Sequence, residues 1–257
     1  MAPAVGSIDP MTGAGLTALL AEATAVRGWA GGGWRWRSTA TSFELLGALP
    51  PVTEPDHREL MLIGGASLLN LRLLTRVLGL HPAVQTMPNP AAPELIAVLR
   101  PEGLRSITTE DRLLAAGIAG ESRGSIPPAG QPAITDPMPD DIRKLLRRAA
   151  KVEHGFLALV SMDRLPFAID PAGGSTMGGI GTAAVIGTVL DGPVARLQAG
   201  QAMQRVLLTA AVNGLAARPV PAVLGEPNGR AALRELIGGG LWPQAVLQLD
   251  DRSPRRR

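Results

Sequence analysis

The sequence contains no cysteine and no tyrosine, and its aromatic residues are limited to four tryptophans and three phenylalanines among 257 residues. The absence of cysteine excludes disulfides, thiolate zinc sites, iron–sulfur clusters and cysteine nucleophiles, and it fits a reducing compartment. Because 46% of the residues are hydrophobic, the chain is long and apolar enough to bury a substantial core without such cross-links.

Groups that titrate in the alkaline range are also scarce, because lysine occurs only at positions 144 and 151. A net charge of only +3 therefore raises the isoelectric point to about 10.4. The segment 252–257 holds four arginines, and the rest of the chain carries 21 basic against 22 acidic residues. We interpret this segment as a solvated, disordered Arg-rich tail; an electrostatic role on RNA or an acidic partner is the minority alternative.

A targeting segment is not visible in the sequence. The first residues, MAPAVGSIDPM, lack the basic and apolar regions of a signal peptide. The longest uncharged run lies between Asp170 and Asp191, and its glycine-rich start, PAGGSTMGGIGT, predicts a loop followed by a strand rather than a membrane span. We expect a soluble, cytoplasmic protein without a membrane partner.

Hydrophobic periodicity predicts a mixture of helices and strands, which is an α+β pattern. Helices are expected over 16–26, 109–118, 140–152 and 230–237, and strands over 34–37, 42–46, 156–161, 183–190 and 245–249. The helix over 140–152 is basic and amphipathic, and we expect Leu145, Leu146 and Ala149 to face inward.

Two longer helices are apolar nearly all round, so we expect them to be buried at the centre of the fold. The first follows an Asp56–Glu59 capping box and ends at Gly79; the second opens at Asp191-Gly-Pro193 and ends at Gly214. When the two helices are aligned at an offset of 135 residues, Gly65 aligns with Gly200 and Gly79 aligns with Gly214. This match predicts a duplicated design with one central helix in each half.

No motif identifies a catalytic residue or a metal site. The histidines at positions 57, 81 and 154 are expected at helix starts or turns, without a second ligand at metal-binding spacing. The glycine run over 173–182 lacks the Lys-Ser/Thr pair of a P-loop and a strand-first GxGxxG, so we interpret it as a connection.

Polar residues on the second central helix are the more unusual feature. Gln201, Gln204 and Arg205 need hydrogen-bond partners if that helix is buried, and either a bound ligand or neighbouring backbone can supply them. Trp34 and Trp36 share one face of a strand, and we interpret them as core residues on an aromatic-poor sheet.

The ordered segments WRWR, TEPDHRELMLIGGASLLNLRLLTRVLGLHPAV, LQAGQAMQRVLLTAAVNGLAARPV and GGGLWPQAVLQL resemble the actinobacterial, Acg-like branch of the nitroreductase-like superfamily. The resemblance covers most of the chain. It implies an α+β nitroreductase-like fold in one domain over 1–251, whose half-units of about 1–139 and 140–251 form a pseudo-dimer around the two central helices. It also implies an FMN site at their junction, with NAD(P)H as reductant. The cofactor-binding candidates are Trp34, Gly200, Gln201, Gln204, Arg205 and Arg218, the last as a phosphate partner.

The chain departs from the family in three places. Family members tend to read Pro-Ser-x-His-Asn-x-Gln-Pro-Trp-Arg-Trp where residues 26–36 read VRGWAGGGWRW, so amide and hydroxyl side chains expected near the flavin are absent. An Arg-Arg-x-Thr-x-Arg stretch is reduced to AGESRG at 119–124, and a long insertion is largely missing around 161–185.

Two functions follow from these observations. The leading hypothesis is an FMN-dependent NAD(P)H oxidoreductase that acts on a small molecule. The alternative is a catalytically degenerate relative that binds flavin, another ligand or a partner protein without turnover. A fused pseudo-dimer is expected to be monomeric, unless a partner protein covers its cleft, and nucleic acid is a distant third partner.

Overall fold

The computed structural model describes residues 23, 33–47, 58–122, 138–165, 181–220, 224 and 228–251. Most of the helix expected over 16–26 lies outside the described residues. So do the Asp56 cap, His57, the glycine run before Gly181 and the arginine tail.

The first half of the chain forms a four-stranded antiparallel sheet packed on one long helix. Along the chain its elements are β1 (Trp34–Ser38), β2 (Phe43–Gly47), α2 (Arg58–Val77), β3 (Leu80–Thr86) and β4 (Leu95–Leu104). The strand order in the sheet is β1-β2-β4-β3. The predicted hairpin is confirmed, with Trp34 paired to Gly47 and Ser38 to Phe43.

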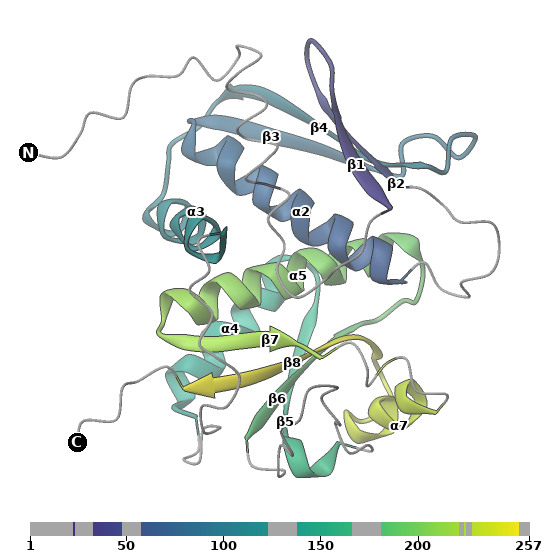
Figure 1. Cartoon of the computed structure of the whole chain (residues 1–257), viewed down its shortest axis with the longest axis vertical. Helices are drawn as coiled ribbons and strands as arrows, with labels where there is room; N and C mark the ends of the chain where they lie inside the picture. Colours follow the sequence, from purple (N-terminus) through teal and green to yellow (C-terminus); the bar gives the residue numbers. More distant parts are fainter. Residues whose placement is uncertain are drawn as a thin grey trace, which may run out of the picture.

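The second half repeats this topology. Its elements are β5 (Phe156–Ser161), the 3-10 turn η1 (Met162–Arg164), β6 (Thr182–Thr188), α5 (Pro193–Val212), β7 (Leu215–Pro219), α7 (Gly229–Leu236) and β8 (Trp242–Asp251). The sheet order β5-β6-β8-β7 is equivalent to that of the first half, and α7 is inserted between the last two strands. Figure 1 shows α2 and α5 side by side between the two sheets. The predicted α+β class and the two central apolar helices are confirmed.

Two further helices flank the central pair. They are α3 (Thr109–Ser122), which packs on α2 and α5, and α4 (Asp140–Val152), which packs on α5 and β5. A capping box starts α3: Thr108 Oγ1 accepts from the Asp111 amide at 3.0 Å, and Asp111 Oδ2 accepts from the Thr108 amide at 3.1 Å. On α4, Leu146 and Ala149 are buried as predicted, but Leu145 is 37% exposed. The inward prediction for Leu145 is therefore wrong, because Ala150 completes the buried face instead.

The central helices cross through a two-fold contact between glycines. A Cβ atom on Gly65 would lie 2.1 Å from the carbonyl oxygen of Leu197, and one on Gly200 would lie 2.1 Å from that of Leu62. The two helices start 135 residues apart, and the same offset relates Gly65 to Gly200 and Leu62 to Leu197. Only glycine lets the backbones approach this closely, so the offset seen in sequence corresponds to a self-complementary contact in space.

Both central helices end as the sequence indicates. Gly79 and Gly214 each follow the last helical turn with φ of +77°, the left-handed conformation that favours glycine at this position. Pro193 occupies the first turn of α5.

The strands β3, β4 and β7 are absent from the sequence prediction. Their signals are weak, because prolines at positions 82 and 101 interrupt β3 and β4 and face each other across the pair. His81 consequently lies in a strand and not at a helix start or turn, which corrects that expectation. His154 does occupy a turn, with φ of 61°.

The hydrophobic cores of the two halves share residues across the central helices. Leu62 and Ala66 of α2 belong to the core beneath the second sheet, whereas Leu197 and Leu208 of α5 belong to the core of the first. Among the described residues α2 alone is long and apolar enough to span a bilayer, and 78% of that stretch is buried, as expected of a central core helix.

Candidate functional site

The tryptophan pair on β1 packs on the core of the first half. Trp34 and Trp36 are partly buried against it, while Arg35 and Arg37 are exposed on the other face. The indole Nε1 of Trp36 donates to Ser67 Oγ of α2 at 2.8 Å. These contacts give both tryptophans a packing role between β1 and α2.

A buried polar chain continues from this point to α5. Ser67 Oγ and Asn70 Nδ2 both donate to the carbonyl oxygen of Ala23, at 3.0 and 3.3 Å. The Asn70 Oδ1 accepts from Gln204 Nε2 at 3.1 Å. Asn70 and Gln204 are fully buried, and this hydrogen bond links their amides across the helix pair.

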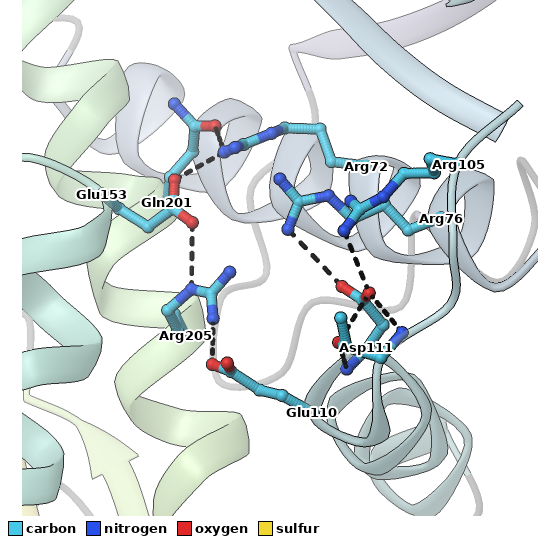
Figure 2. A network of polar contacts seen from close by, with 9 residues as sticks. Arg72, Arg76, Arg105, Glu110, Asp111, Glu153, Gln201 and Arg205 are labelled. Carbon is cyan, nitrogen blue, oxygen red and sulfur yellow. Dashed lines mark hydrogen bonds and ion pairs between the residues drawn. The ribbon is translucent and has the colours of Figure 1, made fainter. Parts of the chain in front are cut away.

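A second polar cluster centres on Glu153, which follows α4 (Figure 2). Its Oε2 accepts from Arg72 Nη1 at 2.5 Å and its Oε1 accepts from Arg205 Nε at 2.9 Å. Arg72 Nη1 also donates to Gln201 Oε1 at 2.6 Å, and Arg205 Nη1 donates to Glu110 Oε1 at 2.7 Å. The cluster therefore joins α2, α3, α4 and α5.

Electrostatics hold Glu153 ionised in this buried position. Its side chain and that of Arg205 are each only 3% exposed. Burial by itself raises the pKa of Glu153, but the charges of Arg72 and Arg205 and their hydrogen bonds outweigh it and hold the pKa below its ordinary value. Sequence reasoning missed Glu153 because it stands alone after a helix; the signal was the buried arginine on α5, which required a carboxylate partner.

A third cluster lies beside the second, around Asp111 of α3 (Figure 2). Arg105 Nη2 is 3.3 Å from Asp111 Oδ2, and Arg76 Nη1 is 3.6 Å from Asp111 Oδ1. Burial and the neighbouring charges of Arg72 and Arg105 lower the pKa of Arg76. Burial by itself raises the pKa of Asp111. The hydrogen bonds from Thr108 and the charges of Arg105 and Arg76 outweigh burial and hold the pKa below its ordinary value.

The remaining candidates are placed differently. Gly200 contacts the Leu62 backbone in the helix crossing. Arg218 lies on β7, where its Nε and Nη2 donate to Gln248 Oε1 at 3.0 and 2.6 Å. These hydrogen bonds thus bring Gln201 and Arg205 into one cluster and Gln204 into another, with Trp34 and Arg218 on the two sheets.

Asp191 belongs to a cluster of its own before α5. It accepts from Arg230 Nη1 at 2.7 Å, from Gln244 Nε2 at 3.1 Å and from Arg196 Nε at 3.3 Å. The hydrogen bond from Arg230 outweighs the effect of burial and holds the pKa of Asp191 well below its ordinary value. This carboxylate links α5, α7 and β8, a role that its position in a loop did not reveal.

The described residues enclose cavities that include the following two. One, of about 330 Å³, lies between α3, α4 and α5; the other, of about 570 Å³, lies beside α7 and Trp242. None of the six cofactor candidates lines either of these two cavities. Within the described ranges no group of three or more His, Asp or Glu side chains is arranged to hold a metal ion.

Part of this chain is similar in sequence to known proteins. No protein-family model matches the chain. Two proteins, from two strains of Mycobacterium tuberculosis and each bearing the provisional name NAD(P)H nitroreductase, are 43% identical over 65 residues. That segment is 25% of this chain and 19% of each relative, so the chain matches only a small part of their length.

The solved structures that resemble this chain are less similar to it in sequence than the two mycobacterial proteins. A Bacteroides fragilis nitroreductase with bound FMN is 14% identical, with 55% of this chain and 88% of that chain covered at a TM-score of 0.40. An FMN-dependent nitroreductase from Clostridium difficile is 13% identical, with 49% and 83% covered at a TM-score of 0.38. The two mycobacterial relatives confirm the resemblance of this chain to the nitroreductase-like superfamily and its actinobacterial branch.

Proposed function

We propose that this chain is an NAD(P)H oxidoreductase of nitroreductase type that uses FMN and acts on a small molecule. The observation that carries the proposal is the repeated half-unit around α2 and α5, joined by the Gly65–Gly200 crossing. This is the arrangement that the resemblance implies for a flavin protein with both halves of its pair in one chain. The name of the two mycobacterial relatives supports the same activity.

Five of the six candidate residues, all except Trp34, do not fit FMN as direct ligands in the form that the structure describes. A ligand has no room at Gly200, because the Leu62 backbone fills that position. The side chains of Gln201, Gln204 and Arg205 bond to other side chains of this chain, and Arg218 bonds to Gln248. When bound, FMN would supply hydride transfer, but we assign no reaction step to these six residues.

This disagreement favours a second candidate function, a catalytically degenerate relative that binds a ligand or a partner without turnover. Its support is that the polar groups expected at the flavin are used within the protein, while the amide and hydroxyl side chains expected over 26–36 are absent from the sequence. Either form is proposed to be a monomer, since the second half-unit of the pair is supplied in the same chain.

A flavin titration separates the two candidates. FMN, FAD and a deazaflavin are added to the purified protein, and binding is followed by quenching of flavin fluorescence. The flavin complex is then mixed with NADH or NADPH without oxygen. Loss of the visible flavin band supports the oxidoreductase, and binding without bleaching supports the degenerate relative. Absence of binding by all three flavins contradicts the proposal of a flavin enzyme.

A further inference from the structure

The cavity between α3, α4 and α5 has an apolar wall built by all three helices. Its lining residues are Leu113 and Leu114 of α3, Leu145, Ala149 and Val152 of α4, and Val212 of α5. Four of these are large and unusually exposed, with 49% exposure for Leu113 and Val152, 40% for Val212 and 37% for Leu145. Exposed apolar side chains gathered around a hollow mark a binding site more often than an ordinary surface.

One of the residues that line this cavity is an exposed arginine. Arg148 lies on α4 between Leu145 and Val152 and lines the cavity. Within the described ranges no ion pair or hydrogen bond involves its guanidinium, in contrast to Arg72, Arg76 and Arg205, whose partners are carboxylates. An exposed guanidinium beside apolar side chains suits a ligand that has an anionic head and an apolar body.

The other charges around the cavity leave a net positive field. Glu110 is the one carboxylate in the lining, and Arg205 pairs with it at 2.7 Å. The helix α4 bears five basic residues against Asp140 and Asp141, and its cations are largely exposed. An anion approaching the mouth is therefore attracted by α4 and meets an offset negative charge at Glu110.

The size of the cavity selects a small ligand. A volume of about 330 Å³ lies at the lower end of the range of about 300 to 1,000 Å³ that is typical of small-molecule sites. The remaining polar lining groups are few: Thr209 and Asn213, of which Asn213 Nδ2 already donates to the Thr209 carbonyl at 2.8 Å. Such a lining recognises an apolar body through shape and its head group through charge.

We propose that the α3–α4–α5 cavity is a binding site for a small amphiphilic anion, a medium-chain carboxylate or a carboxylate on a compact apolar ring. The apolar body lies against Leu113, Leu145 and Val212, and the carboxylate accepts hydrogen bonds from Arg148. The site goes beyond the proposed flavin chemistry and does not depend on it, because it shares no residue with the six flavin candidates.

The test is calorimetric titration of the full chain, without added flavin, with three ligands of equal length: octanoate, octan-1-ol and octylammonium. Octanoate is expected to bind roughly two- to fivefold more tightly than octan-1-ol, the effect of one exposed charge-assisted contact. The substitution Arg148→Gln is expected to remove this difference and leave octan-1-ol unchanged. The matched control Arg147→Gln changes a neighbouring exposed cation that does not line the cavity, and should preserve the preference.

A second variant tests the apolar wall. Val212→Trp fills the cavity from an exposed position, so it is expected to fold normally by circular dichroism and to weaken octanoate and octan-1-ol together by roughly tenfold. Three results overturn the proposal: octanoate that does not bind, octylammonium that binds more tightly than octanoate, or an octanoate affinity that survives both Arg148→Gln and Val212→Trp.

Discussion

At the scale of single residues, Glu153 shows how one carboxylate can hold several helices together. It receives two arginines, one from each central helix, and it is almost completely buried. A buried ion pair adds little net stability compared with apolar packing, but the loss of one partner leaves a charge without compensation and is costly. The central helices therefore depend on Glu153 more than on any exposed pair.

Replacing Glu153 by glutamine should lower the free energy of unfolding at neutral pH by about 2 to 4 kcal/mol, because Arg72 and Arg205 lose their common counter-charge. The matched control is Glu110→Gln, whose carboxylate is 64% exposed; its loss should cost less than about 1 kcal/mol. Urea unfolding of the three proteins measures both effects. Equal losses for the two variants would show that burial of Glu153 has no special weight.

The pH dependence of the same variant follows from the sign of the pKa shift. The pKa of Glu153 is lowered in the folded state, so its stabilisation is complete above the unfolded pKa of about 4.3 and is lost as the pH falls through the folded pKa. The gap in unfolding free energy between wild type and Glu153→Gln should therefore be constant near neutrality and narrow below about pH 4. A gap that widens on acidification would contradict the assignment.

At the scale of elements, the crossing of α2 and α5 is set by two glycines. Alanine is favoured over glycine inside a helix by about 1 kcal/mol, which taken alone predicts that Gly200→Ala stabilises the protein. The added methyl would lie 2.1 Å from the Leu62 oxygen, however, and the atom it meets is backbone that cannot rotate away. The steric term is therefore expected to dominate.

Gly200→Ala should reduce the free energy of unfolding by about 1 to 3 kcal/mol, the cost of overpacking a tight contact. Gly65→Ala should cost a similar amount, because its contact with Leu197 is the two-fold equivalent. Gly240→Ala is the control, since a Cβ there meets no atom within 4 Å, and its effect should stay within about 0.5 kcal/mol. Thermal or urea unfolding compares the three, and a neutral Gly200→Ala would mean that the helices lie further apart.

At the scale of the whole molecule, the halves exchange core residues through the central helices. Leu197 and Leu208 complete the first core, and Leu62 and Ala66 contribute to the second. The Glu153 cluster adds a polar link between the halves, since Arg72 belongs to α2. Neither sheet keeps a complete core without the opposite helix.

Unfolding is therefore expected to occur in one cooperative transition despite the duplicated topology. Circular dichroism and tryptophan fluorescence should give coincident urea curves, because Trp34 and Trp36 report on the first half and Trp242 on the second. The variant Trp242→Phe removes the second-half reporter as a control. Two separated transitions would show that the half-units fold independently.

Much of the element pattern could be predicted because it is encoded locally. The central helices were recognised from their apolar composition, from a capping box before the first and a proline at the start of the second, and from the glycine that ends each. The helix α4 and the strand β5 were predicted with the bounds that the structure has. The strands β3 and β4 were missed because their prolines weaken the period-two signal, and only pairing with each other stabilises them as strands.

The sequence by itself determined the central helices, their common design and the need of Gln201, Gln204 and Arg205 for partners, since helix signals and burial are properties of a short stretch. The tertiary structure alone decided which residues are those partners. They are Arg72, Asn70 and Glu153, which lie 52 to 134 residues away along the chain. It also decided that Leu145 and Arg148 line a cavity. Hydrogen bonds and cavities join residues that are distant in the chain, and no local pattern specifies which distant residue will face a given side chain.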